Sequence, residues 1–329
     1  MTTMLQKIIE IGFLLSLLAA VFFSTPGLAQ QTEGGRYPTK PITFIVPIPP
    51  GGTADASCRL ISKEAEKFLG QPIVVVNKPG GSFAIAIAAI ASSKPDGYTI
   101  GYAGHPGMFV TPLTNTVPYH PVRDIREIMQ FGYLNIGVTV KGDSPFTNFM
   151  DIVAWARQHP NKLTYGSAGV GSFGHLALEQ LAKKENVQFN HIPFKGSAET
   201  QVALLGGHIL VATGDFNYSS LESGQIRLVF LITESPSPDY PKTPILRDLG
   251  YNIPAPTMLN IAGPKGMPDD VVKRLDDAFS KAMKEPTFIK GMRDLKLTTF
   301  YRNGKDLDSY VAANFDAFEK LLKEEGLIK

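Results

Sequence analysis

The stretch Ile42–Asp55 reads ITFIVPIPPGGTAD and carries the signals that decide the fold. Its first residues, Ile42–Val46, are apolar and mostly β-branched, which predicts a buried strand. Prolines and glycines at 47–52 then interrupt regular structure, and Thr53 is a suitable N-cap for a helix over 54–69. A strand, a glycine turn and a helix N-terminus in this order predict an anion-binding loop. The glycines would also be needed in a βα turn that binds nothing, because they allow the backbone to change direction. The anion-binding and the purely structural interpretations therefore both stay open.

Residues 1–29 have the features of a secretory signal peptide. Lys7 supplies the positive start, an apolar run covers 11–23, and Gly27 and Ala29 are the small residues of a cleavage site. The apolar run is too short to span a membrane. We therefore expect an exported protein.

Composition excludes several classes of function. The 329 residues carry a formal net charge of +2, and this near balance argues against a nucleic-acid partner. Cys58 is the single cysteine, so no intramolecular disulfide and no cysteine-based metal site can form. The six histidines have no metal-ligand spacing, and we expect neither a metal nor a cofactor. An exported chain without disulfides fits a bacterial periplasm.

Strand and helix signals alternate in two sets that meet near Leu134. Repeated βα units predict, in each set, a mainly parallel sheet with helices on both faces. Ligands of such sheets bind at the carboxyl ends of strands, so the loops that follow the predicted strands form the candidate site. The proline-rich segment 235–256 is expected to cross between the two sets. The other candidate loops are 77–81, 104–107, 166–174 and 213–216.

Gly169–Gly174 reads GVGSFG and matches the G-x-G-x-x-G dinucleotide fingerprint between a predicted strand and a predicted helix. Two features oppose NAD(P) binding. No acid ends the next predicted strand, and an exported protein would have to acquire the cofactor outside the cytoplasm. The alternative is a serine-rich anion loop, with backbone N–H groups and the hydroxyls of Ser167 and Ser172 as donors.

Acidic and aromatic side chains lie in or beside these loops. Asp55 either complements a helix dipole or orients the amides of its own loop, and Asp215 follows a predicted strand. His175 is as consistent with a structural role as with ligand contact. Three aromatic residues would by default be core, but together they could face a flat ligand: Phe83, Phe173 and Phe216.

Several motifs resemble the substrate-binding proteins of tripartite tricarboxylate transporters, of the Bordetella-uptake-gene type. They include YPTKPITFIVPIPPGGTAD, LGQPIVVVNKPGG, NKLTYGSAGVGSFGHLALE and HIPFKGSAE, in an order that covers essentially the whole mature chain. The resemblance implies a two-lobed α/β periplasmic binding protein of the venus-flytrap kind with type II topology. It also implies a monomer that is not an enzyme, binds a small carboxylate in its cleft and delivers it to membrane permease subunits.

The expected boundaries are 36–133 together with 257–329 for lobe 1, and 134–256 for lobe 2. In the family, ligand carboxylates are held mainly by backbone amides, hydroxyls and waters, and no arginine lies in the corresponding loops here. The resemblance and the loop positions together predict these ligand-binding residues: Ile48, Pro49, Gly52, Thr53, Asp55, Gly81, Phe83, His105, Ser167, Ala168, Gly171, Ser172, Phe173, His175, Asp215 and Phe216.

Two departures from the family pattern bear on the ligand. Ser82–Ile85 stands where a glycine-rich stretch with an asparagine is usual, and Phe173 stands where a smaller or polar residue is common. Both add apolar bulk near the expected cleft, which favours an aromatic or otherwise apolar carboxylate over citrate. Two other functions stay open: an NAD(P)-binding oxidoreductase that uses the Gly169–Gly174 loop, and a ligand-sensing subunit of a signalling system.

Overall fold

The structure is a computed structural model, and it describes the chain except residues 1–36, 235, 252 and 325. The predicted signal peptide therefore lies outside the described residues. Lys40–Lys329 form one compact unit, to which the following description applies. Within the described part of the chain, no helix is both long enough and apolar enough to cross a membrane.

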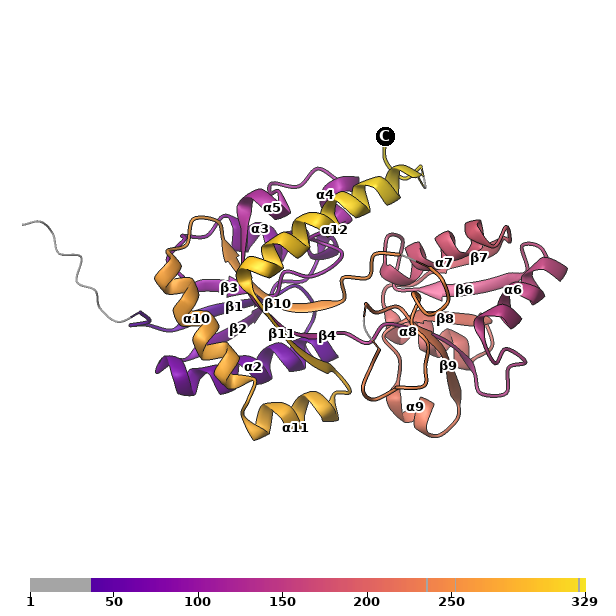
Figure 1. The fold of residues 1–329 in the computed structure, drawn as a ribbon, viewed down its shortest axis with the longest axis horizontal. Coiled ribbons are helices and arrows are strands. Elements are labelled where there is room, and N and C mark those ends of the chain that lie inside the picture. Colours follow the sequence, from indigo (N-terminus) through magenta and orange to yellow (C-terminus); the bar gives the residue numbers. More distant parts are fainter. Residues whose placement is uncertain (1–36, 235, 252, 325) are drawn as a thin grey trace, which may run out of the picture. The chain divides into compact units, whose positions relative to one another are not determined.

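Six strands form the first sheet, in the order β11-β4-β10-β3-β1-β2 (Figure 1). β1 pairs in parallel with β2 and β3, whereas the pairs β10–β3, β10–β4 and β11–β4 are antiparallel. β1 is buried along nearly its whole length, as expected for a strand between parallel neighbours. The strands are β1 (Ile42–Val46), β2 (Ile73–Asn77), β3 (Thr99–Gly101), β4 (Ile125–Tyr133), β10 (Met258–Pro264) and β11 (Thr298–Asn303).

Helices cover both faces of this sheet (Figure 1). On one face α2 packs against α10 and α11, and on the other α12 packs against α5 and β4 while α3 packs against β10. The helices are α2 (Thr53–Leu69), the 3₁₀ turn η1 (Gly81–Phe83), α3 (Ala84–Ala91), α4 (Thr111–Thr114), α5 (Pro121–Asp124), α10 (Asp269–Ala282), α11 (Pro286–Asp294) and α12 (Gly304–Glu324).

Five strands form the second sheet, in the order β7-β6-β8-β5-β9. β6 pairs in parallel with β7 and β8, and β5 pairs antiparallel with β8 and β9. The strands are β5 (Gly137–Lys141), β6 (Leu163–Ser167), β7 (Phe189–Pro193), β8 (Val211–Gly214) and β9 (Ile226–Leu231). Their helices are α6 (Phe149–Gln158), α7 (Phe173–Lys184), α8 (Ser197–Leu205) and α9 (Tyr218–Glu222).

The two-lobed α/β architecture predicted from the sequence is present, but both sheets are mixed rather than mainly parallel. The difference arises where the chain crosses between sheets. β4 leads through three residues into β5, and β10 returns to insert between β3 and β4. Both β5 and β10 run antiparallel to their neighbours. The predicted lobe boundaries stay a prediction.

Residues 129–140 belong to two different sheets, because β4 ends at Tyr133 and β5 begins at Gly137. The apolar helix α3 buries only Ala86, Ile87 and Ile90, and the Ile85 side chain is 53% exposed. Cys58 is fully buried in the core, and burial raises the pKa of its thiol.

Candidate functional site

The loop after β1 is organised by Asp55, which lies in the first turn of α2. Its carboxylate accepts hydrogen bonds from the Gly51 N–H at 3.0 Å, Arg59 Nε at 3.0 Å and Asn77 Nδ2 at 2.8 Å. Asn77 Nδ2 also donates to the Ile48 carbonyl at 2.8 Å. Burial alone would raise the pKa of Asp55, but these hydrogen bonds outweigh it and lower the pKa below its ordinary value. Asp55 thus holds the loop in place.

Thr53 does not cap α2, contrary to the prediction. The N-cap is Gly52, which has no side chain, and Thr53 is the first helical residue. The Thr53 hydroxyl instead donates to Asp215 Oδ2 at 2.6 Å, which links α2 to the loop after β8. The first N–H groups of α2 therefore have no side-chain cap.

Asp215 lies at the carboxyl end of β8. Its N–H donates to Ser197 Oγ at 3.0 Å, and its Oδ1 is buried without a hydrogen-bond partner among the described residues. Burial raises the pKa of this carboxyl group above its ordinary value, which favours the protonated form. A protonated carboxyl group with one oxygen unoccupied can donate a hydrogen bond to an anion.

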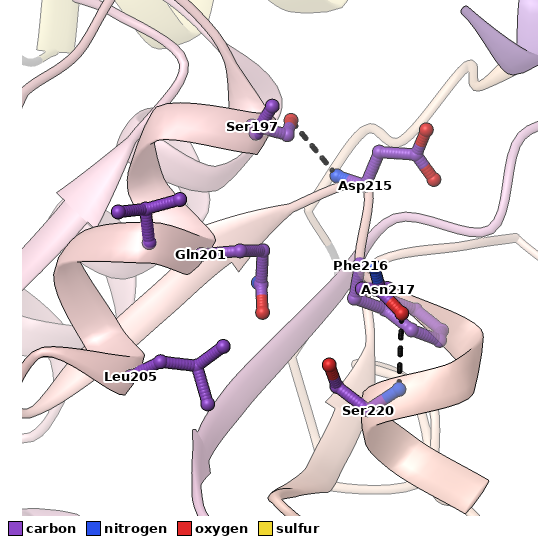
Figure 2. A pocket seen from close by; sticks show the side chains of 9 residues that line it. Ser197, Gln201, Leu205, Asp215, Phe216, Asn217 and Ser220 are labelled. Atoms are coloured by element: carbon purple, nitrogen blue, oxygen red, sulfur yellow. Dashed lines mark hydrogen bonds between the residues drawn. The ribbon is translucent and has the colours of Figure 1, made fainter.

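A pocket of about 360 Å³ adjoins Asp215 between α8 and α9 (Figure 2). Val202, Leu205 and Phe216 give it apolar walls. Gln201 extends into it from α8, with its Nε2 donating to Thr139 Oγ1 at 3.1 Å and its Oε1 buried without a partner among the described residues. In Figure 2 the Asp215 carboxylate points away from Gln201, so Asp215 borders this pocket on one side and contacts Thr53 on the other.

The second predicted loop, 166–174, is tied together by polar side chains. Ser167 Oγ donates to the Gly169 carbonyl at 3.0 Å and lies 2.8 Å from His191 Nε2. The Gly171 N–H donates to His175 Nδ1 at 3.1 Å, and the His175 and His191 rings are 4.3 Å apart. Burial and the neighbouring His175 lower the pKa of His191 to about 4, so the His191 ring is neutral near pH 7.

The loop ends at the start of α7, where Ser172 is the N-cap and accepts from the His175 N–H at 3.4 Å. Phe173 follows and stacks on His105 of the other lobe, with 3.6 Å between ring centroids and 21° between planes. Burial lowers the pKa of His105 to about 3, so this ring is neutral as well. One face of Phe173 is therefore already occupied by a protein side chain.

The second glycine turn has unusual backbone geometry. Ser82 has φ 49° and Phe83 has φ 76°, the left-handed region that favours glycine. Phe83 packs edge-on to Tyr102, with 6.1 Å between ring centroids, and the Ser82 carbonyl accepts from the Thr111 hydroxyl at 2.9 Å. Glycine would adopt this conformation without strain, whereas Ser82 and Phe83 carry side chains there.

The structure brings together some of the predicted residues and separates others. Thr53 contacts Asp215, and His105 contacts Phe173. Phe216 is 4% exposed and packs against Tyr218, so it is a core residue that also borders the pocket. The remaining predicted residues lie at exposed or partly buried loop positions: Ile48, Pro49, Gly52, Gly81 and Ala168.

Sequence reasoning missed Asn77, His191 and Ser197, which support the loops after β1, β6 and β8. It also missed Gln201, which lines the pocket and donates to Thr139. Only the strand order shows which loop each of the first three residues meets. Among the described residues no group of three or more potential metal ligands is gathered.

The chain forms two mixed β-sheets flanked by helices and crosses twice between them. With candidate ligand loops on both sheets, this arrangement defines a solute-binding protein fold. A family model described as "Tripartite tricarboxylate transporter family receptor" matches residues 57–327, and the chain belongs to this family. The chain is 33% identical over 300 residues to the UPF0065 protein in the gbd 5' region of Cupriavidus necator, covering 91% of each chain.

Solved structures agree with the family. A TctC solute binding protein from Polaromonas, solved without ligand, is 30% identical with a TM-score of 0.76, over 88% of this chain and 99% of that one. Rpa4515 of R. palustris, solved with adipate, is 28% identical with a TM-score of 0.75, over 88% of this chain and 98% of that one. The predicted family and two-lobed fold are confirmed.

Proposed function

We propose that this protein is a periplasmic, non-enzymatic binding protein that captures a small carboxylate for the permease subunits of a tripartite tricarboxylate-type transporter. Membership of the receptor family and the adipate held by the related Rpa4515 support this proposal. The observation that carries it is the contact between Thr53 and Asp215, because this contact places an uncapped helix start opposite a carboxyl group with an unoccupied oxygen.

The ligand carboxylate would be held without an arginine. The first-turn N–H groups of α2 point into the Pro49–Thr53 loop, where the helix dipole favours a negative charge. Asp215, whose pKa is raised by burial, would supply a proton from Oδ1 to the second carboxylate oxygen. The N-terminal turn of α7, with Ser172, would add donors from lobe 2.

The rest of the ligand would be apolar. The pocket lies on the side of Asp215 away from its carboxylate, and an apolar ligand body that reached past Asp215 would contact its walls of Val202, Leu205 and Phe216. Its volume of about 360 Å³ lies near the lower end of the range for small-molecule sites, about 300–1,000 Å³. Phe173 adds apolar surface at the lobe contact. These features favour an aliphatic or aromatic carboxylate over citrate.

The proposal is tested by calorimetry and thermal unfolding of the mature protein with adipate, benzoate, citrate, amino acids and NADH. A ligand at 100 times its Kd should stabilise the protein by about 2.7 kcal/mol. We expect a clear rise in the unfolding midpoint with an apolar carboxylate and none with NADH. A rise with NADH alone would instead support an NAD(P)-binding oxidoreductase that uses the Gly169–Gly174 loop.

A matched pair of variants tests whether the contact between Thr53 and Asp215 belongs to the ligand site. Thr53→Val removes the hydroxyl that donates to Asp215 at 2.6 Å, and Thr147→Val removes a hydroxyl that donates to Asp151 at the same 2.6 Å in an exposed turn. Thr53→Val should weaken carboxylate binding about tenfold, the equivalent of one hydrogen bond. Thr147→Val should leave binding unchanged. Equal effects of the two variants would contradict the proposed site.

A further inference from the structure

A second cavity lies beside the segment that leads from β9 to β10, residues 232–257, here called the crossover segment. Its volume is about 560 Å³, larger than that of the pocket beside Asp215. Its walls come from the crossover segment, from Tyr133 at the end of β4, and from β11 and α12. The cavity shares no residue with the pocket beside Asp215.

Arg302 of β11 is one of the charged residues that line the cavity. Its guanidinium group lies over the Tyr310 ring, with 3.9 Å from Cζ to the ring centroid, and its Nη2 is 3.4 Å from the Tyr133 hydroxyl. Its Nη1 is buried and has no hydrogen-bond partner among the described residues. A buried charged donor without a partner is costly, which indicates that a partner is missing.

The cavity has an excess of positive charge. Arg247 lines it from the crossover segment, and within the described residues no carboxylate lies in ion-pair range of Arg247 or Arg302. Glu234 is its only acidic lining residue, and one of its oxygens already accepts from the Tyr310 hydroxyl. The lining therefore carries two arginines and one glutamate, whose carboxylate accepts from Tyr310 and also interacts electrostatically with Arg302.

The opposite wall is apolar. Ile253 and Ala255 of the crossover segment face the cavity together with Ala313 and Ala317 of α12. A guanidinium group beside such a wall suits a ligand with a planar oxyanion at one end and a short apolar body at the other.

We propose that this cavity is a second anion site, which binds a small carboxylate with a short apolar body between Arg302, Arg247 and the alanine face of α12. The carboxylate takes the place of the missing partner of Arg302 Nη1. Since its walls belong both to the crossover segment and to elements of the first sheet, the bound anion fixes the crossover segment against that sheet. The site does not depend on the proposed ligand contacts of Thr53 and Asp215.

The experiment uses the full mature chain and benzoate, with neutral benzamide as the matched probe and sulfate as an anion without an apolar body. Titration calorimetry is carried out on Asp215→Ala, which impairs the first site and leaves the second intact. We expect benzoate to bind this variant and benzamide to bind at least tenfold more weakly. A crystal soaked with 4-iodobenzoate should show anomalous density beside Arg302.

Two variants test the residues. Arg302→Gln should weaken benzoate binding at this site at least tenfold. Arg247→Gln, which leaves the stack on Tyr310 intact, should weaken it several-fold, so that a folding defect of Arg302→Gln cannot decide the result alone. Arg123→Gln, at an exposed arginine paired with Asp124, is the control and should change nothing.

The proposal is overturned if Asp215→Ala binds neither benzoate nor sulfate, or if Arg302→Gln and Arg247→Gln both bind benzoate like the parent protein. Sulfate binding as tight as that of benzoate would overturn the role of the apolar wall. Failure of Thr53→Val to affect carboxylate binding would count against the first site only, so the two proposals fail separately.

Discussion

Thr53 Oγ1 donates to Asp215 Oδ2 at 2.6 Å, although 162 positions separate these residues in the chain. The bond joins the first turn of α2, beside the first sheet, to the loop after β8 of the second sheet. Because Asp215 Oδ1 is buried and has no hydrogen-bond partner in the described part of the chain, the pair presents one open acceptor or, when Asp215 is protonated, one donor.

The first prediction concerns the pH dependence of carboxylate binding. Burial raises the pKa of Asp215, and a ligand carboxylate beside it favours the protonated form further. Ligand affinity should therefore fall as the pH rises above the pKa of Asp215, by up to about tenfold per pH unit. Asp215→Asn, which keeps a donor but cannot ionise, should bind with little pH dependence. Calorimetry in buffers of different ionisation enthalpy should detect proton uptake by the parent protein.

A second prediction separates the loop network of Asp55 from a simple helix-dipole effect. Asp55→Asn loses the charged acceptor for Gly51, Arg59 and Asn77, and should lower the free energy of unfolding by about 2 kcal/mol. Asp270→Asn is the control, because Asp270 is an exposed acid in the first turn of α10. It should cost only about 0.3–1 kcal/mol in urea unfolding. Similar losses in both variants would mean that the Asp55 hydrogen bonds add nothing to the free energy of unfolding beyond the helix-dipole effect.

Gly174 allows α7 to pack closely on β8. A Cβ atom at this position would lie 1.5 Å from Thr213 Oγ1, whereas a Cβ at Gly196, before α8, would meet nothing within 4 Å. Gly174→Ala should lower the free energy of unfolding by about 1–3 kcal/mol or more, and Gly196→Ala should change it little. Urea unfolding followed by the fluorescence of Trp155 would measure both. An unaffected Gly174→Ala would show that the helix can move away at no cost.

The stability of the protein should fall in acid because His105 is buried in its neutral form. Burial lowers the pKa of His105 to about 3, below the value near 6.5 of an unfolded chain. The unfolded state therefore binds the proton first, and stability is lost as the pH falls from about 6.5 towards 3, by up to about 1.4 kcal/mol per pH unit. His191, with a pKa lowered to about 4, adds to the loss.

The test of this acid effect is His105→Phe, which keeps an aromatic ring against Phe173 but takes up no proton. Its free energy of unfolding should depend less steeply on pH between 6 and 4 than that of the parent. His159→Phe, at an exposed histidine stacked on Trp155, is the control for replacing a histidine ring. Parallel pH profiles for His105→Phe and the parent would remove His105 as the cause.

Many of the local elements could be predicted from the sequence because their signals are local. The strand at Ile42–Val46 and the helix that follows the glycine turn lie where the apolar pattern and the turn residues place them. The strand order could not be predicted in the same way. That β10 enters the first sheet between β3 and β4 depends on contacts between residues more than 120 positions apart.

The candidate site could likewise be predicted only in part. The glycine loops could be found from composition, but the hydrogen-bond partner of each side chain depends on residues that are distant in the chain. Thr53 has the residue type of an N-cap, yet its hydroxyl is used by Asp215, whose loop is distant in the chain. Helix α11 and strand β11 were also missed. β11 lies at the sheet edge and alternates weakly, and it carries Arg302 of the second cavity.

The position of β10 sets the order in which the protein can fold. The second sheet is built from one continuous stretch of chain, Gly137–Leu231, and all of its strands exist once that stretch has been synthesised. The first sheet lacks an inner strand until Met258–Pro264 has been made, since only then can β3 and β4 be joined. During synthesis the strands of the second sheet can therefore pair first, whereas β3 and β4 of the first sheet can be joined only after β10 has been made.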